Sequence, residues 1–100
     1  MASGNVSIVR IYRGEDKLHE VVLVGDRMTI GRSNKVDITL ESNAISRRHA
    51  ELILKPDGCW WINDLFSGAG TFINGKAEME HKLEMGDRVM IDDFLLLFGH

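Results

Sequence analysis

Residues 50–63 read AELILKPDGCWWIN, two short apolar runs on either side of a turn signal. Apolar and polar side chains alternate around Leu52 and Leu54, which is the period of a strand with one face in a protein core. The Pro-Asp-Gly sequence at residues 56–58 has the composition of a tight turn, and residues 59–63 form the second run. This stretch predicts two neighbouring β-strands in the middle of the chain.

The same pattern continues on both sides of this pair. Further strands are expected at residues 6–12, 19–24, 27–31, 36–40, 71–73, 88–91 and 94–98, with a short run near Leu83. Asn74-Gly75 is a strong hairpin-turn signal, and residues 41–48 are polar without a helical period. Many short strands at regular spacing indicate an all-β sandwich or barrel. Trp60 and Trp61 fall on opposite faces of one strand, so we expect one in the core and one partly exposed.

The length of the chain fits one domain. Its 100 residues, 44% hydrophobic and 27% charged, have an ordinary globular composition with no repeat or linker. We expect a single domain over residues 1–100 with a core at about 6–98. Because the chain stops directly after its last predicted strand, we also expect it to be part of a longer protein.

A cytoplasmic location is expected from three features. No run approaches the roughly 18 apolar residues of a membrane-spanning helix, and the N-terminus lacks the pattern of a secretory signal. The single cysteine, Cys59, cannot form an internal disulfide, which suits a reducing compartment. We therefore expect no membrane partner.

Charge is distributed unevenly along the chain. The net charge of −3 disfavours nucleic-acid binding, yet residues 1–50 carry eight Lys or Arg against six Asp or Glu, and residues 51–100 carry four against nine. Four basic residues lie close together in sequence: Arg32, Lys35, Arg47 and Arg48. Such a cluster can be ordinary solvated surface or an anion site.

Catalytic chemistry finds little support in the sequence. Ser46, His49 and Asp64 could suggest a hydrolase, but no serine lies in a G-x-S-x-G turn. Residues 68–73 contain only the first two glycines of a dinucleotide fingerprint and lead into a strand. The histidines and Cys59 have no metal-ligand spacing. We predict that the protein is not an enzyme and needs no cofactor and no metal.

The remaining polar residues form one ordered series. Gly31-Arg32-Ser33 is followed by Ile45-Ser46-Arg47-Arg48-His49, then by Asp64-Leu65 with Ser67, and then by Gly70-Thr71-Phe72-Ile73-Asn74-Gly75. In this order and spacing the series closely resembles the forkhead-associated (FHA) domain family, whose mark is G-R, S-x-x-H and G-T-x-x-N-G. The resemblance runs from about residue 6 to residue 98.

The resemblance implies an FHA-type sandwich of two antiparallel sheets, about eleven short strands, with binding loops at one end. It also implies phosphothreonine-dependent recognition of a peptide or protein, with a Ser/Thr kinase or its substrate as partner. By the same resemblance the residues that contact the phosphopeptide are Arg32, Ser46, Arg47, Ser67, Gly68 and Ala69. Arginine and hydroxyl side chains suit a phosphate dianion because they supply charge-assisted hydrogen bonds. The residues expected to support the site are Gly31, His49, Asn74 and Gly75.

One departure from the family pattern keeps a second function open. Many members have an asparagine between Ser67 and Gly70 that binds the backbone of the peptide, and Ala69 occupies that place here. The alternative is a phosphate-independent interaction or assembly domain on the same fold. For the residues that follow the phosphothreonine, Ala44 and Ile45 suggest an uncharged, partly apolar surface.

Overall fold

The computed structural model describes residues 5–100. This part of the chain forms eleven strands and no helix. The strands are β1 (Ile8–Arg13), β2 (Asp16–Val22), β3 (Arg27–Gly31), β4 (Ile38–Thr39), β5 (Ala50–Leu54), β6 (Trp60–Asp64), β7 (Phe72–Ile73), β8 (Lys76–Ala77), β9 (Glu80–Lys82), β10 (Arg88–Ile91) and β11 (Phe94–Gly99). Because there is no helix in this part, none is present there that could cross a membrane.

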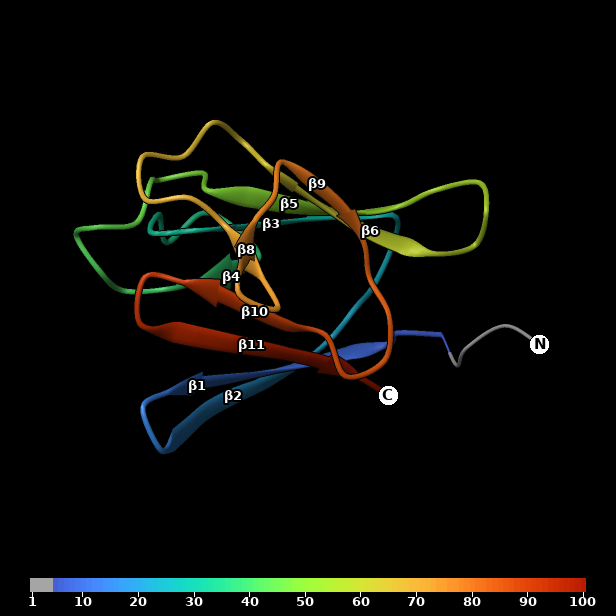
Figure 1. Cartoon of the computed structure of the whole chain (residues 1–100), viewed down its shortest axis with the longest axis horizontal. Coiled ribbons are helices and arrows are strands. Elements are labelled where there is room, and N and C mark those ends of the chain that lie inside the picture. Colours follow the sequence, from blue (N-terminus) through green and yellow to red (C-terminus); the bar gives the residue numbers. More distant parts are fainter. Residues whose placement is uncertain (1–4) are drawn as a thin grey trace.

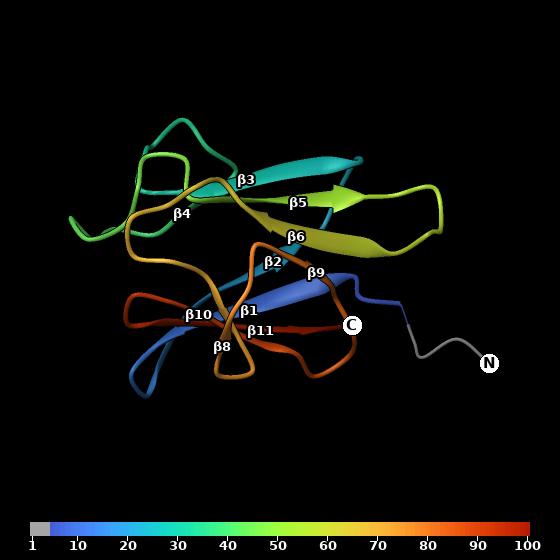
Figure 2. The ribbon, with the colours of Figure 1, turned by 45° about the horizontal axis from the view of Figure 1, so that its top comes forward.

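The strands form two sheets that pack face to face (Figures 1 and 2). The first sheet has the order β2-β1-β11-β10-β7-β8, and the second has the order β4-β3-β5-β6-β9. This confirms the predicted all-β sandwich. The two sheets are antiparallel as predicted except at one pair, where β4 lies parallel to β3 with Ile30 opposite Ile38. The loop of residues 32–37 leaves the end of β3 and returns alongside it, where Asp37 accepts from the Thr29 amide at 2.8 Å. From there β4 runs in the same direction as β3.

The central pair predicted from residues 50–63 is the β5–β6 hairpin of the second sheet. Its register places Leu52 opposite Ile62, and both side chains are fully buried. Trp60 is buried and Trp61 is half-buried, as expected for neighbours on opposite faces. The exposed side of Trp61 is covered by the Lys55 ammonium, 4.0 Å from the ring centre.

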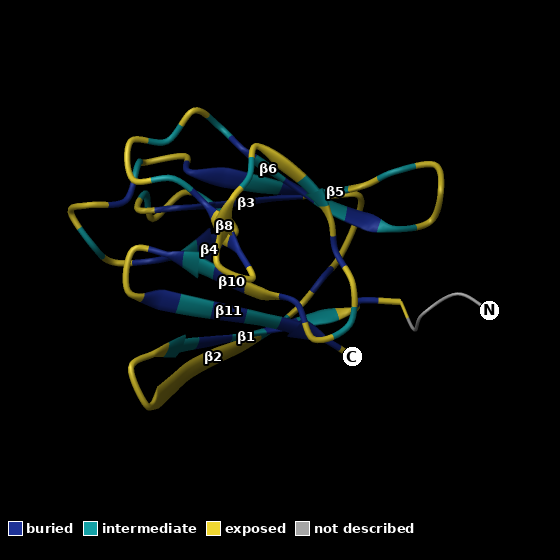
Figure 3. Cartoon of the chain, viewed as in Figure 1, coloured by how far each residue is buried: buried dark blue, intermediate teal, exposed yellow. Residues whose placement is uncertain are grey.

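The core lies between the two sheets and is almost entirely aliphatic (Figure 3). The inward residues of β1, β10 and β11 face those of β3, β5 and β6. The largest completely buried side chains include Phe98, Ile11, Ile30, Leu40, Ile45 and Leu52. Burial of this kind contributes roughly 1.5–3 kcal/mol for each large side chain, so the framework that carries the loops is rigid.

The short strand β8 was not predicted, β9 ends one residue before the run expected near Leu83, and other strands differ in length. β9 is polar and partly exposed, and both residues of β8 are exposed, so neither has an apolar pattern. Their strand character comes from pairing with β6 and β7. β2 begins at Asp16, three residues before its predicted start at residue 19, because only Gly14 and Glu15 are needed to reverse the chain. β4 is limited to Ile38–Thr39, two residues of the five that were predicted.

Three connections converge at one end of the sandwich, on the left in Figure 1. They are the β3–β4 loop (residues 32–37), the β4–β5 loop (residues 40–49) and the β6–β7 loop (residues 65–71). These loops contain most of the residues that the sequence singled out for binding.

Candidate functional site

The base of the site is a close approach between the end of β3 and the β4–β5 loop. The Arg32 amide donates to the Ser46 carbonyl at 3.0 Å, and the Ser33 amide donates to the Arg47 carbonyl at 3.3 Å. A Cβ atom on Gly31 would lie 2.0 Å from the Arg47 carbonyl oxygen. Only glycine permits this approach, which brings Arg32 next to Ser46 and Arg47.

His49 holds two loops together from inside the protein. Its side chain is fully buried, its Nδ1 accepts from the Ser46 amide at 3.3 Å, and its Nε2 donates to the Gly70 carbonyl at 2.7 Å. These contacts define the neutral tautomer with the proton on Nε2, because an amide can only donate and a carbonyl can only accept. His49 thus joins the β4–β5 loop to the β6–β7 loop and cannot contact a ligand.

Ser46 lies between the same two loops but is partly exposed. Its Oγ accepts a hydrogen bond from the Gly68 amide at 3.4 Å. Among the described residues, this is the one hydrogen bond that the Gly68 amide makes to the β4–β5 loop. A serine hydroxyl can donate its one proton while the lone pairs of its oxygen accept other hydrogen bonds. The Ser46 O–H therefore remains available to a ligand oxygen.

Arg32 and Arg47 bring uncompensated positive charge to the site. Both side chains are exposed, and neither forms an ion pair within residues 5–100. The Nε of Arg32 donates to the Ile45 carbonyl at 3.0 Å, which fixes the side chain against the β4–β5 loop. The terminal amino groups of its guanidinium remain as a planar fork for two anionic oxygens.

The β6–β7 loop is held by one carboxylate. Asp64, at the end of β6, accepts from the Ser67 amide at 2.9 Å and from the Thr71 hydroxyl at 2.8 Å, and the Ser67 hydroxyl also donates to it. The Ser67 Oγ in turn accepts from the Gly70 amide at 3.0 Å. Burial alone raises the pKa of Asp64, but the hydrogen bonds from Ser67 and Thr71 outweigh it and hold that pKa below its ordinary value.

Most of the predicted site residues are therefore brought together. Gly31, Arg32, Ser46, Arg47, His49, Ser67 and Gly68 are linked by the contacts above. Ser67, predicted to contact the peptide, uses its hydroxyl proton on Asp64 and braces the loop. Asp64 and Thr71 were not predicted as site residues, although an aspartate three residues before a serine is the signal of such a turn.

Asn74 and Gly75 lie in the β7–β8 turn, apart from this group. The Asn74 side chain donates to Asp87 at 3.0 Å and accepts from the Arg88 amide at 3.0 Å. Both residues have positive φ, 49° and 90°, as this tight turn requires. Asn74 clamps the turn to the start of β10, and none of its hydrogen bonds within residues 5–100 goes to the three loops.

The loop surface beside Arg32 also carries the polar side chains of Glu41, Ser42 and Asn43, which line a shallow pocket together with Arg32. Ala69 is exposed and has no side-chain group that could hydrogen-bond a peptide backbone. Ala44 is exposed as well, but Ile45 is 1% exposed and belongs to the core. The expectation that Ile45 forms part of a peptide-facing surface was wrong, because its side chain fills the space between the sheets.

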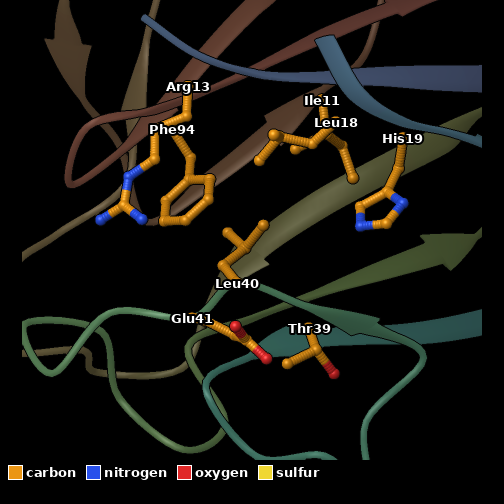
Figure 4. A pocket seen from close by; sticks show the side chains of 8 residues that line it. All are labelled: Ile11, Arg13, Leu18, His19, Thr39, Leu40, Glu41 and Phe94. Atoms are coloured by element: carbon orange, nitrogen blue, oxygen red, sulfur yellow. The ribbon is translucent and has the colours of Figure 1, made fainter. Parts of the chain in front are cut away.

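A separate cavity of 450 Å³ opens between the edges of the two sheets (Figure 4). Leu18 and Phe94 from the first sheet face Leu40 of the β4–β5 loop across it, with Arg13 and Glu41 at one side. None of the predicted site residues lines this cavity, so it is not part of the candidate site. Within residues 5–100 no group of three or more His, Cys, Asp or Glu side chains is arranged to hold a metal ion.

The contacts of Ser46, His49 and Asp64 do not form a hydrolytic triad. Both ring nitrogens of His49 are bound by backbone groups, so neither can accept a proton from the Ser46 hydroxyl. Asp64 Oδ1 lies 3.9 Å from His49 Nε2, on the same nitrogen that already donates to Gly70. The geometry serves to position loops.

A two-sheet sandwich that presents a basic, hydroxyl-bearing group on converging loops defines a recognition module for an anionic ligand. The FHA domain family matches residues 28–92, and the chain belongs to that family. It is similar to an oxoglutarate dehydrogenase inhibitor of Corynebacterium diphtheriae, 34% identical over 88 residues. That match covers 88% of this chain and 61% of the relative, so the chain spans about three-fifths of the relative's length.

Two solved structures are also similar. The FHA domain of the CT664 protein from Chlamydia trachomatis is 27% identical with a TM-score of 0.85, over 96% of this chain and 98% of that chain. Mycobacterium tuberculosis EmbR in complex with a low-affinity phosphopeptide is 26% identical with a TM-score of 0.83, over 95% of this chain and 24% of that chain.

Proposed function

We propose that this domain recognises phosphothreonine in a protein partner and binds without catalysing a reaction. The observation that carries the proposal is the uncompensated guanidinium of Arg32, fixed beside the partly exposed Ser46 hydroxyl and Arg47. A phosphate dianion needs such charge-assisted donors on a rigid frame. Membership of the FHA family supports the proposal, as does the phosphopeptide complex of the similar EmbR protein.

Each of the proposed contact residues has a distinct part. Arg32 supplies the fork for two phosphate oxygens, Ser46 donates its free hydroxyl proton, and Arg47 adds charge and a backbone amide. The Gly68 and Ala69 backbone borders the path of the peptide. The partner is a substrate of a Ser/Thr kinase or the kinase itself, and the setting is the cytoplasm, where ATP supplies such kinases.

The test is a calorimetric titration of the chain with a degenerate phosphothreonine peptide library and with its unphosphorylated counterpart. Arg32→Ala should weaken phosphopeptide binding by about tenfold to a hundredfold, because a charge-assisted hydrogen bond contributes roughly 1.5–3 kcal/mol. Arg32→Lys should retain part of the affinity, since it keeps the charge but loses the fork.

Arg88→Ala is the matched control. Arg88 is also an exposed arginine without an ion pair in the described chain, but it lies on β10 near Asn74. It should leave the affinity unchanged. Equal binding of both libraries, or unchanged affinity in a folded Arg32→Ala variant, would favour the phosphate-independent interaction domain.

A further inference from the structure

Phe66 combines two features that an ordinary loop residue lacks. Its φ is 57°, in the left-handed region that bulky residues rarely adopt. Its side chain is 90% exposed, the most exposed large apolar side chain in the described part of the chain. The strained backbone conformation of Phe66 therefore does not serve to bury its side chain in the core.

The hydrogen bonds on either side impose this conformation. The preceding amide, of Leu65, donates to the His49 carbonyl at 2.9 Å, and the following amide, of Ser67, donates to Asp64 at 2.9 Å. The turn fixed by these bonds directs Phe66 away from the protein. Strain that persists because the surroundings hold it is a feature of binding and active sites.

Phe66 lies in the β6–β7 loop, which contacts the proposed phosphate site through Gly68. Gly68, two residues later, is the residue whose amide contacts Ser46. Residues 68–70 are Gly-Ala-Gly and carry no side chain beyond a Cβ atom, so a peptide can approach this side of the loop closely. Phe66 is the one large exposed side chain between β6 and β7.

We infer that Phe66 is a specificity-determining residue that selects a large apolar side chain beside the phosphothreonine of the partner. The inference rests on the proposed function and deepens it. Where a polar side chain at position 69 would hold the peptide backbone, this loop offers an aromatic surface that gains free energy by being covered with apolar atoms. Aromatic residues, phenylalanine among them, are enriched in the cores of protein interfaces.

The experiment uses a phosphothreonine peptide library in which one flanking position at a time is varied. The wild-type chain should select a large apolar residue at one flanking position. Phe66→Asn should lose that selection, with about tenfold weaker binding of the selected peptides, while still requiring the phosphate. Phe66→Leu should keep most of the selection, since it retains apolar bulk.

The melting temperature gives a second readout, because Phe66→Asn should raise stability while it weakens binding of the selected peptides. Asparagine tolerates the left-handed region better than phenylalanine, so Phe66→Asn should raise the melting temperature by about 2–5 °C. A lower melting temperature would mean that Phe66 serves the fold and would overturn the inference. Val24→Asn, which replaces a 62% exposed apolar residue in the β2–β3 connection, is the control and should not alter selection.

The outcomes separate the two claims. Phosphate-dependent binding with the same residue selection in the wild type and Phe66→Asn would overturn the role of Phe66 and leave the proposed function intact. Absence of phosphate-dependent binding in the wild type would overturn both.

Discussion

His49 and Ala69 belong to the same site but differ completely in their surroundings. His49 is fully buried and bonded at both ring nitrogens, whereas Ala69 is exposed and makes no side-chain hydrogen bond. A change at His49 therefore acts first on the folded protein. A change at Ala69 acts first on the ligand.

His49→Ala should lower stability and binding together. The variant leaves the Ser46 amide and the Gly70 carbonyl without their buried partner, and each such loss costs about 1–3 kcal/mol. Thermal unfolding and phosphopeptide calorimetry on the same samples would measure both. A wild-type melting temperature with lost binding would contradict the buttress role.

Ala69→Asn should tighten phosphopeptide binding by up to about fivefold, since it offers a hydrogen bond of about 1 kcal/mol or less to the peptide backbone. The fold should be unaffected, because Ala69 is exposed and its φ is not positive. Calorimetry with phosphorylated and unphosphorylated peptides checks the prediction. Flat or reduced affinity for the phosphopeptide would mean that the peptide does not cross the loop at Ala69.

At the scale of elements, the site depends on how β3 ends. Gly31 is the last residue of β3, and there the strand passes directly under the β4–β5 loop. The adjoining hydrogen bonds of Arg32 and Ser33 are made possible by this contact. The strand and the loop thus act as one unit that presents Arg32 and Ser46 together.

Gly31→Ala should displace the β4–β5 loop, because the new methyl group would lie 2.0 Å from the Arg47 carbonyl oxygen. We expect a loss of about 1–3 kcal/mol in the free energy of unfolding, as for other overpacked positions, and much weaker phosphopeptide binding. Gly68→Ala is the control for stability, since no atom lies within 4 Å of its added Cβ and its φ is not positive. Equal melting temperatures for the two variants would contradict the prediction.

At the scale of the whole molecule, two buried carboxylates tie loops to the sheets at separate places. Asp64 fixes the β6–β7 loop, and Asp87 accepts from Asn74, from the Glu84 amide at 2.8 Å and from His81 at 2.8 Å. Burial raises the pKa of Asp87, but the hydrogen bonds from Asn74 and Glu84 outweigh it and lower that pKa, as at Asp64.

Because the pKa values of both carboxyls are lower in the folded chain than their ordinary value of 3.8, their contribution to stability is present above about pH 3.8. It is lost as the pH falls further, through the folded-state pKa values. The melting temperature, followed from pH 7 to pH 2, should therefore drop steeply below about pH 4.

Asp64→Asn and Asp87→Asn should each be less stable than the wild type at pH 7, by about 1–3 kcal/mol, and should show a shallower acid drop. The double variant should show the shallowest drop. A pH profile parallel to that of the wild type would contradict the assignment.

The sequence by itself determined the framework of this protein. Alternation around Leu52 and Leu54, the turn at residues 56–58 and the Asn74-Gly75 signal are local properties, and each predicted strand or turn is present. The ordered motif from Gly31 to Gly75 was sufficient for the family, which the match over residues 28–92 shows. Such patterns are visible in the sequence because the alternation of apolar and polar residues along a strand is set by residues that are close together in the chain.

Only the tertiary structure decided the rest. The parallel pairing of β4, the edge strands β8 and β9, and the hydrogen bond from Asn74 to the Asp87 side chain depend on how segments meet in the folded chain. The left-handed conformation of Phe66 is likewise imposed by the bonds that the flanking Leu65 and Ser67 amides make to the His49 carbonyl and to Asp64. Hydrogen bonds between distant backbones leave no periodic trace in the residues that make them, so only the folded chain reveals them.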